Sequence, residues 1–224
     1  MKNTWAKELF NYYKALKPDI ELADNIEWLY PQQHKEVLSV LQTFLLKYYN
    51  DKERRTLLLG INPGRFGAGV TGVNFTASKQ LTEDCFIPHH FKKGSELSAE
   101  FIYEMIHAFG SVEDFYAKHF IGSVCPLGFV KGGKNINYYD DKVLQVAVEP
   151  FIIESMKALS RLSFNKQKCI CIGGEKNYKY LHKLNSNHQW FHQIVSVPHP
   201  RFIMQYRRKQ KAEYIQQYLD VLKK

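Results

Sequence analysis

Residues 56–75 read TLLLGINPGRFGAGVTGVNF, and this stretch decides how the rest of the chain is interpreted. Its apolar start, Thr56 to Leu59, is typical of a buried strand. Five glycines follow within the sixteen residues 60–75, with the amide side chain of Asn62 near the beginning. Glycines at the end of a strand mark a tight turn or a place where the backbone approaches a ligand closely. We therefore interpret residues 60–75 as a binding loop.

Four short apolar segments outline a sheet. They alternate with helical patterns, and this predicts an α/β fold, a three-layer α/β/α sandwich around a short, central, parallel, four-stranded sheet. No repeat, linker or change of composition marks a second domain, so residues 1–224 are expected to form one domain. The expected strands are Arg55–Ile61, His119–Cys125, Gln167–Ile172 and Gln193–Val197.

Three helices are expected from the spacing of apolar residues. The first contains Val37 and Tyr48 and ends near Asn50. The second covers residues 140–159, where Pro150 predicts a kink or a split into two helices. The third closes the chain from about Arg207.

The formal net charge of +9 makes a polyanionic partner plausible. A solvated basic helix near the terminus is the commoner explanation of a charge cluster by itself, so charge alone does not establish such a partner. Much of the excess lies near the C-terminus, at Arg201, Arg207, Arg208, Lys209, Lys211, Lys223 and Lys224.

The first twenty residues lack the apolar core of a signal peptide, and no run reaches membrane-spanning length. We expect a cytoplasmic protein, in a prokaryotic cytosol or nucleoid rather than a nucleus, with no membrane partner. The cysteines lack the spacing of zinc or iron–sulfur ligands, so we expect core thiols, no metal and no cofactor. They are Cys85, Cys125, Cys169 and Cys171.

Ligands of parallel α/β sheets bind beyond the carboxyl ends of the strands. In this chain those positions are residues 60–75, 126–135, 173–174 and 198–201. The glycine loop is not followed by Gly-Lys-Ser/Thr and lacks G-x-G-x-x-G at the strand end. Nucleotide hydrolysis and hydride transfer are therefore disfavoured.

The motifs at these positions resemble a known family. GINPGRFGAGVTGVNF resembles the first motif of the SMUG branch of the uracil-DNA glycosylase superfamily, in which GMNPG precedes TGVPF. Residues 96–129, ELSAEFIYEMIHAFGSVEDFYAKHFIGSVCPLGF, are similar to its middle region ending in CPLxF. GKNIN at 133–137 resembles GRNLT, and VPHPR at 197–201 resembles HPSPR. The resemblance covers roughly residues 25–222.

The resemblance implies a monofunctional DNA glycosylase, which flips a nucleotide out of DNA, hydrolyses its N-glycosidic bond and leaves an abasic site. Asn62 would hold the attacking water, and His199 would donate a hydrogen bond to the base oxygen on which negative charge collects. Without the resemblance, His199 beside prolines and Asn62 before Pro63 would be ordinary turn residues.

The remaining roles follow from the same resemblance. Phe75 would stack on the flipped base, while backbone amides near Ile61 and Gly64 contact its polar edge. The complete set of expected base contacts is Ile61, Gly64, Phe66, Phe75 and Ser123. The expected DNA contacts are Lys134, Arg201, Phe202, Arg207 and Arg208.

Residues 201–208, RFIMQYRR, have two interpretations. They form a wedge that fills the gap left by the flipped base while arginines hold phosphates, or they start a helix with one apolar face. We favour the wedge. The partner is then single- or double-stranded DNA containing deaminated bases, and the protein is expected to be a monomer.

Two departures from the family affect substrate choice. Gly122-Ser123 stands where the family commonly has His-Asn, whose amide reads uracil, and HPSPRN is shortened to HPRFIM. Gly122 and Ser123 are expected to leave room at the pocket wall, which extends the range from uracil to other deaminated bases such as xanthine. A mismatch-specific uracil or thymine glycosylase and a catalytically silent nucleic-acid-binding module remain as alternatives.

Overall fold

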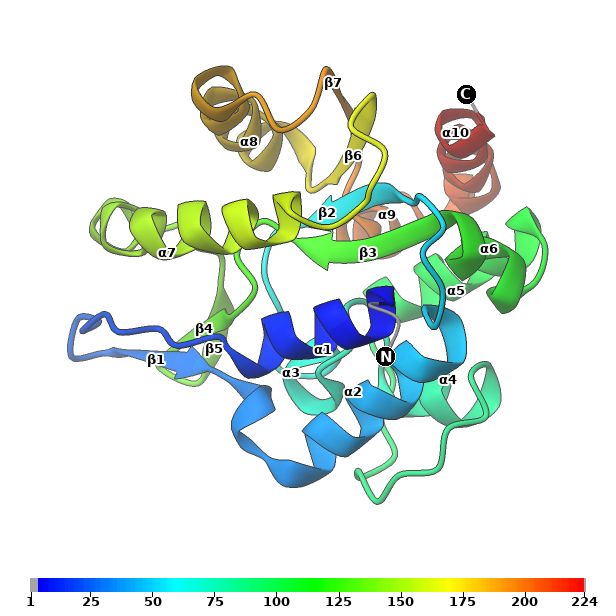
Figure 1. Ribbon diagram of the computed structural model, residues 1–224, viewed down its shortest axis with the longest axis horizontal. Coiled ribbons are helices and arrows are strands. Elements are labelled where there is room, and N and C mark those ends of the chain that lie inside the picture. The colour runs from blue at the N-terminus through cyan, green and yellow to red at the C-terminus, as the bar shows by residue number, and fades with distance from the viewer. Residues whose placement is uncertain (1–3, 224) are drawn as a thin grey trace.

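The computed structural model describes residues 4–223, so Lys224 of the basic tail lies outside the described residues. The four expected strands form one parallel sheet in the order β3-β2-β6-β7, which confirms the predicted sheet. Helices flank this sheet (Figure 1), with α8 packed on β6 and β7 and with α6 and α10 on the two edge strands. The strands are β2 Thr56–Gly60, β3 His119–Ser123, β6 Lys168–Ile172 and β7 Gln193–Val197.

The central strands are apolar because both faces of the sheet are covered. Leu58 and Leu59 in β2 are fully buried, as are Cys169 and Cys171 in β6. All four cysteines are buried free thiols, which confirms the expectation of core thiols.

The three expected helices are all present, and one of them differs in its continuity. The predicted first helix is α2, Lys35–Tyr48, and the closing helix is α10, Lys211–Lys223, behind a short 3-10 turn. A kink or a split was expected at Pro150, and the split is wrong, because α7 runs unbroken over Lys142–Ser160. Pro150 removes only the hydrogen bond to the carbonyl of Val146, and Val146 lies on the exposed side of the helix, where water can donate to that carbonyl.

The other helices complete the covering layers. Within residues 4–223, no helix is long and apolar enough to cross a membrane. The remaining helices of the fold are α1 Trp5–Lys14, α3 Ala68–Thr71, α4 Ser78–Glu83, α5 Leu97–Phe109, α6 Val112–Lys118, α8 Gly174–His188 and α9 Pro200–Tyr206, with 3-10 turns at Pro31–Gln33 and Arg208–Gln210.

A second, antiparallel sheet was not expected from the sequence. It has the order β1-β4-β5, with β1 Ile26–Leu29, β4 Gly128–Lys131 and β5 Lys134–Ile136. Gly132 and Gly133 join β4 to β5 with φ of 55° and 72°, the backbone that a tight hairpin turn requires. The hairpin carries the GKNIN motif to the glycine loop.

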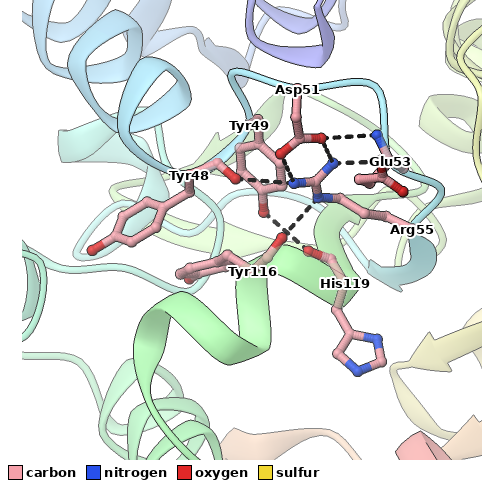
Figure 2. A network of polar contacts seen from close by, with 7 residues as sticks. All are labelled: Tyr48, Tyr49, Asp51, Glu53, Arg55, Tyr116 and His119. Atoms are coloured by element: carbon pink, nitrogen blue, oxygen red, sulfur yellow. Dashed lines mark hydrogen bonds and ion pairs between the residues drawn. The ribbon is translucent and has the colours of Figure 1, made fainter.

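A buried arginine ties the start of β2 to the elements around it (Figure 2). The Arg55 side chain is fully buried, and its guanidinium donates to both carboxylate oxygens of Asp51 at 2.7 Å. It also donates to the backbone carbonyls of Tyr116 and Tyr48. These contacts join the end of α2, the end of α6 and β2, at the opposite end of the strands from the glycine loop.

Candidate active site

A pocket of about 380 Å³ lies beyond the carboxyl ends of the central strands, where the sequence predicted a site. Every parallel strand contributes to it through the residues at its end or just after it. The structure brings together Ile61, Asn62, Gly64, Phe75, Ser123, His199, Arg201 and Phe202 from the predicted set. The lining also includes Gly60, Pro63, Ala68, Asn74, Glu96, Ser98, Asn135, Ile136, Asn137, Tyr139, Gly173, Gln205 and Tyr206.

The Asn62 amide is fixed by the β4–β5 hairpin and the segment after it. Its Nδ2 donates to the carbonyls of Pro63 and Ile136, both at 3.3 Å, and its Oδ1 accepts from the backbone N–H of Tyr138 at 3.1 Å. A carbonyl oxygen has two lone pairs, so Oδ1 can still accept a hydrogen bond from a water molecule. The second sheet therefore orients the amide that the sequence singled out.

His199 caps the N-terminus of α9. Its Nδ1 accepts a hydrogen bond from the backbone N–H of Arg201 at 3.1 Å, so in the neutral ring the proton is on Nε2. Burial, followed by the positive charge of Arg201, lowers the pKa of His199 to about 4. At neutral pH the ring is therefore uncharged and offers an Nε2–H donor.

The Phe75 ring explains why β2 ends in glycine. A Cβ at Gly60 would lie 2.7 Å from Cε2 of Phe75, closer than two carbons can pack. Phe75 itself has a φ of 52°, which is unusual for a bulky residue and points to a functional constraint. Its ring lies beside the imidazole of His199, with centroids 5.8 Å apart. The glycine thus leaves room for an aromatic wall next to His199.

Ser123 and Gly122 point to opposite faces of the parallel sheet. The Ser123 hydroxyl lines the pocket, is buried, and makes no hydrogen bond with any described residue. A Cβ at Gly122 would instead meet Phe120 at 3.1 Å and Leu59 at 3.3 Å. The expectation that Gly122 leaves room at the pocket wall is therefore wrong, because successive strand residues point to opposite faces.

Four predicted residues lie outside the pocket lining. The Phe66 side chain is 58% exposed and packs under the Arg65 guanidinium, 4.7 Å from the ring centroid, so the structure does not bring it to a base site. Lys134, Arg207 and Arg208 are exposed. The Arg207 guanidinium lies 5.7 Å from the ring of Phe202, at the rim formed by α9.

Helix α9 shows features of both interpretations of residues 201–208, the helix with one apolar face and the wedge. Ile203 and Met204 are buried, as a helix with one apolar face requires. Phe202 is 43% exposed and Tyr206 is 68% exposed, with their rings 5.8 Å apart. Only these two aromatic side chains of the segment are free to contact a partner.

Sequence reasoning missed several polar residues of the pocket, and Asn135 and Glu96 are two of them. Asn135 accepts from the backbone N–H of Arg65 at 3.2 Å and so joins the hairpin to the glycine loop. The carboxyl of Glu96, just before α5, also lines the pocket. Burial raises the pKa of Glu96 to about 7, and the charge of Arg201 opposes the shift. GKNIN pointed to the first of these residues, whereas no spacing marks the second.

The described residues contain no cluster of three or more histidine, cysteine or carboxylate side chains that could hold a metal ion. The side chains that line the pocket include amides, the neutral imidazole of His199, hydroxyls and the carboxyl of Glu96. This set can orient water and donate hydrogen bonds to a developing anion.

Comparisons with known proteins agree with the geometry. A family model described as the uracil DNA glycosylase superfamily matches residues 46–223. The crystal structure of wild-type SMUG2 from Pedobacter heparinus is similar, with a TM-score of 0.95 and 41% sequence identity over 99% of this chain and 98% of that chain. No curated protein sequence matches. The resemblance and the fold expected from the motifs are thereby confirmed, and the chain belongs to the uracil DNA glycosylase superfamily as a SMUG-type DNA N-glycosylase.

Proposed function

We propose that the protein removes uracil from DNA as a monofunctional glycosylase and leaves an abasic site. The observation that carries the proposal is the meeting of Asn62, Phe75 and neutral His199 in one pocket. The name of the Pedobacter heparinus relative and that of the superfamily support the same substrate.

The proposed reaction begins when a nucleotide is flipped into the pocket and its base stacks on Phe75. The bond between C1′ and the base breaks with its electron pair passing to the base. His199 donates from Nε2 to the base oxygen that gains negative charge. An amide is a weak base, so Asn62 positions the water without deprotonating it, which suits attack on an oxocarbenium-like sugar. Backbone amides near Ile61 and Gly64 hold the polar edge of the base.

The proposed DNA contacts surround the pocket. Arg201 and Phe202 lie at its rim, with Phe202 as the wedge that replaces the flipped base. Arg207, Arg208 and Lys134 are exposed cations that would hold phosphates. The net charge of +9 supports attraction to a polyanion. We propose that a monomer carries out these steps in the cytoplasm.

We extend the proposed substrate range to xanthine on the basis of Ser123 alone. Its buried hydroxyl has no partner among the described residues and can either donate or accept, whereas an amide has a fixed donor end and a fixed acceptor end. Xanthine presents the same carbonyl, N–H, carbonyl sequence as uracil on its six-membered ring. A hydroxyl is also smaller than an amide and leaves more room for a second ring.

An abasic-site assay on a uracil-containing oligonucleotide tests the proposal. Alkali-labile product from a U·G or single-stranded uracil substrate, with intact T·G DNA, supports it. Cleavage restricted to mismatches, including T·G, would favour a mismatch-specific enzyme. Tight DNA binding without any product would favour a silent binding module.

The proposed reaction uses no metal. Enzyme treated with a chelator should release uracil at an unchanged rate. Loss of activity that zinc or iron restores would contradict this part of the proposal.

A further inference from the structure

Glu96 is a half-buried acid of the pocket that the proposed reaction on uracil does not use. Its carboxyl lines the pocket and makes no hydrogen bond or ion pair with any residue of the described chain 4–223. The partial burial of this carboxyl is enough to raise its pKa, so the ionised form is disfavoured there. An unpaired acid inside a ligand pocket therefore suggests a partner on the ligand.

The carboxyl lies directly over the glycine loop. A Cβ at Gly67 would collide with its Oε2, and a Cβ at Gly64 would lie 3.4 Å from its Oε1. The Nδ2 of Asn135 approaches the same point above Gly64, at 3.3 Å. Glycine at these two positions thus gives the acid access to the space in which the proposed function has the loop backbone contact the base.

Several charged and titratable residues lie near Glu96 in the pocket or along the chain. Arg201, on α9, is the one whose charge acts on it, and His199 at the start of α9 is neutral. Tyr139, before α7, and Tyr206, at the end of α9, also line the pocket. The glycine loop contributes Arg65, and Lys92 and Lys93 precede Glu96 in the chain, while Glu100 follows it by one turn on α5.

The exposure of the lining residues indicates which part of a flipped purine Glu96 would face. Ser123, at the end of β3, is buried, whereas Glu96 is half-buried and close enough to the exposed Arg201 for that charge to act on it. A flipped purine places its six-membered ring deepest and its five-membered ring, which carries the sugar, nearest the rim. The five-membered ring has two nitrogens, and N9 is bonded to the sugar. N7 is the acceptor that remains for an acid at this level.

We propose that Glu96 is a catalytic acid for deaminated purines, donating a hydrogen bond and then a proton to N7 of the flipped base. This inference rests on the proposed function, since it uses the same pocket, Asn62 and base orientation. Uracil has a carbon-bound hydrogen rather than a nitrogen on the corresponding edge, so the acid has no acceptor there.

The step balances as a hydrolysis. The C1′–N9 bond breaks and its electron pair passes to the base, while the Glu96 proton moves to N7, so the purine leaves without added negative charge. Glu96 remains as a carboxylate. The water held by Asn62 forms the C1′–O bond and loses a proton to solvent, from which Glu96 is reprotonated. No redox partner is needed.

The pH dependence has a definite sign. Because the pKa of Glu96 is raised to about 7, the proton is present below that pH and is lost above it. The ionised form would place a negative charge beside the N7 lone pair. The contribution of Glu96 to purine release should therefore be full in mildly acidic solution and disappear in alkaline solution.

The test measures single-turnover release of xanthine and of uracil from otherwise identical oligonucleotides between about pH 5.5 and 9. The variants are Glu96→Gln, which cannot transfer a proton, and Glu96→Asp, which can. Glu100→Gln, in the first turn of α5, is the matched control, because Glu100 lies outside the pocket lining. The readout is the ratio of wild-type to variant rate at each pH, which cancels the titration of the base itself. Far-UV circular dichroism and melting temperature check that each variant folds.

For xanthine, the ratio of wild type to Glu96→Gln should be on the order of 100-fold at acidic pH and fall towards one in alkaline solution. For uracil it should be at least about tenfold smaller and should not follow pH, since general acid catalysis of this size requires an acceptor. Glu96→Asp should retain the pH trend.

Equal ratios for the two bases would overturn the inference, because they indicate that the effect of Glu96 does not depend on an N7 acceptor. A xanthine ratio that does not fall as pH rises would also overturn it, as would absence of xanthine release by the wild type. Absence of uracil release by the wild type would instead count against the proposed function.

Discussion

The backbone N–H of Arg201 donates a hydrogen bond to Nδ1 of His199 at 3.1 Å, so helix α9 determines which imidazole nitrogen carries the proton. The same helix presents Phe202 at the rim of the pocket. The group proposed to stabilise the leaving base and the side chain proposed to enter the DNA are thereby held by one element.

His199 should be neutral, with its proton on Nε2, at every pH above about 5. Burial and the charge of Arg201 lower its pKa to about 4, below the usual value of 6.5. Between these two values the unfolded chain binds more protons than the folded one, so this residue makes stability fall as pH falls from about 6.5 to 4. Two-bond ¹⁵N–¹H correlation spectra of histidine-labelled protein measure both quantities. A midpoint near 6.5 or a proton on Nδ1 at pH 7 would contradict this assignment.

Gly60→Ala should lower uracil release by displacing the ring of Phe75. The added Cβ would lie 2.7 Å from Cε2 of that ring. Forcing an extra carbon into packed surroundings typically costs about 1–3 kcal/mol, so a lower melting temperature is also expected. Gly94→Ala is the control, because its Cβ would find the nearest atom 3.8 Å away. Indistinguishable excision rates for Gly60→Ala and the wild type would show that the position of Phe75 does not matter.

Ser123→Asn should shift preference towards uracil. The larger side chain reduces the space for a second ring, and the amide restores fixed donor and acceptor ends. Competition between xanthine and uracil oligonucleotides in one reaction gives the preference directly. An unchanged ratio between wild type and Ser123→Asn would mean that Ser123 does not set the substrate range.

The sequence predicted those parts of the fold that depend on local pattern. Strands buried on both faces read as apolar runs, and Leu57 to Leu59 form such a run directly before the glycines. The sequence did not predict the β1-β4-β5 sheet, because β5, Lys134–Ile136, is too short to show alternating polar and apolar residues. The unbroken α7 could not be foreseen from Pro150, since its tolerance depends on which side of the helix Val146 occupies.

The residues of the candidate site also differ in whether the sequence could identify them. Asn62, Phe75 and His199 stand in motifs at strand ends, so position and resemblance together identified them. Glu96 became part of the pocket only through the packing of its segment against the glycine loop, a contact between residues 29 or more positions apart that no spacing encodes. The orientation of Gly122 required the strand register to be known.

Asp51→Asn should destabilise the protein at neutral pH, because it weakens the partner of the buried Arg55 guanidinium. The bonds from Arg55 lower the pKa of Asp51. The stabilisation is therefore present above the unfolded value of about 3.8 and is lost as pH falls through the folded pKa. Since the Asp51 side chain is 42% exposed, solvent screening limits the expected loss to about 1–2 kcal/mol. Urea unfolding at pH 7 and pH 3 measures the change, with exposed Asp19→Asn as control; equal losses at both pH values would contradict the pairing.

The central claim is that His199 stabilises the departing base, and the single-turnover rate of uracil excision by His199→Ala tests it most directly. Loss of one well-placed donor is worth roughly 2.7–4 kcal/mol, so the rate should fall by about 100- to 1,000-fold. Affinity for abasic DNA should be retained, and exposed His192→Ala should cleave like the wild type. Near wild-type excision by His199→Ala would contradict the account.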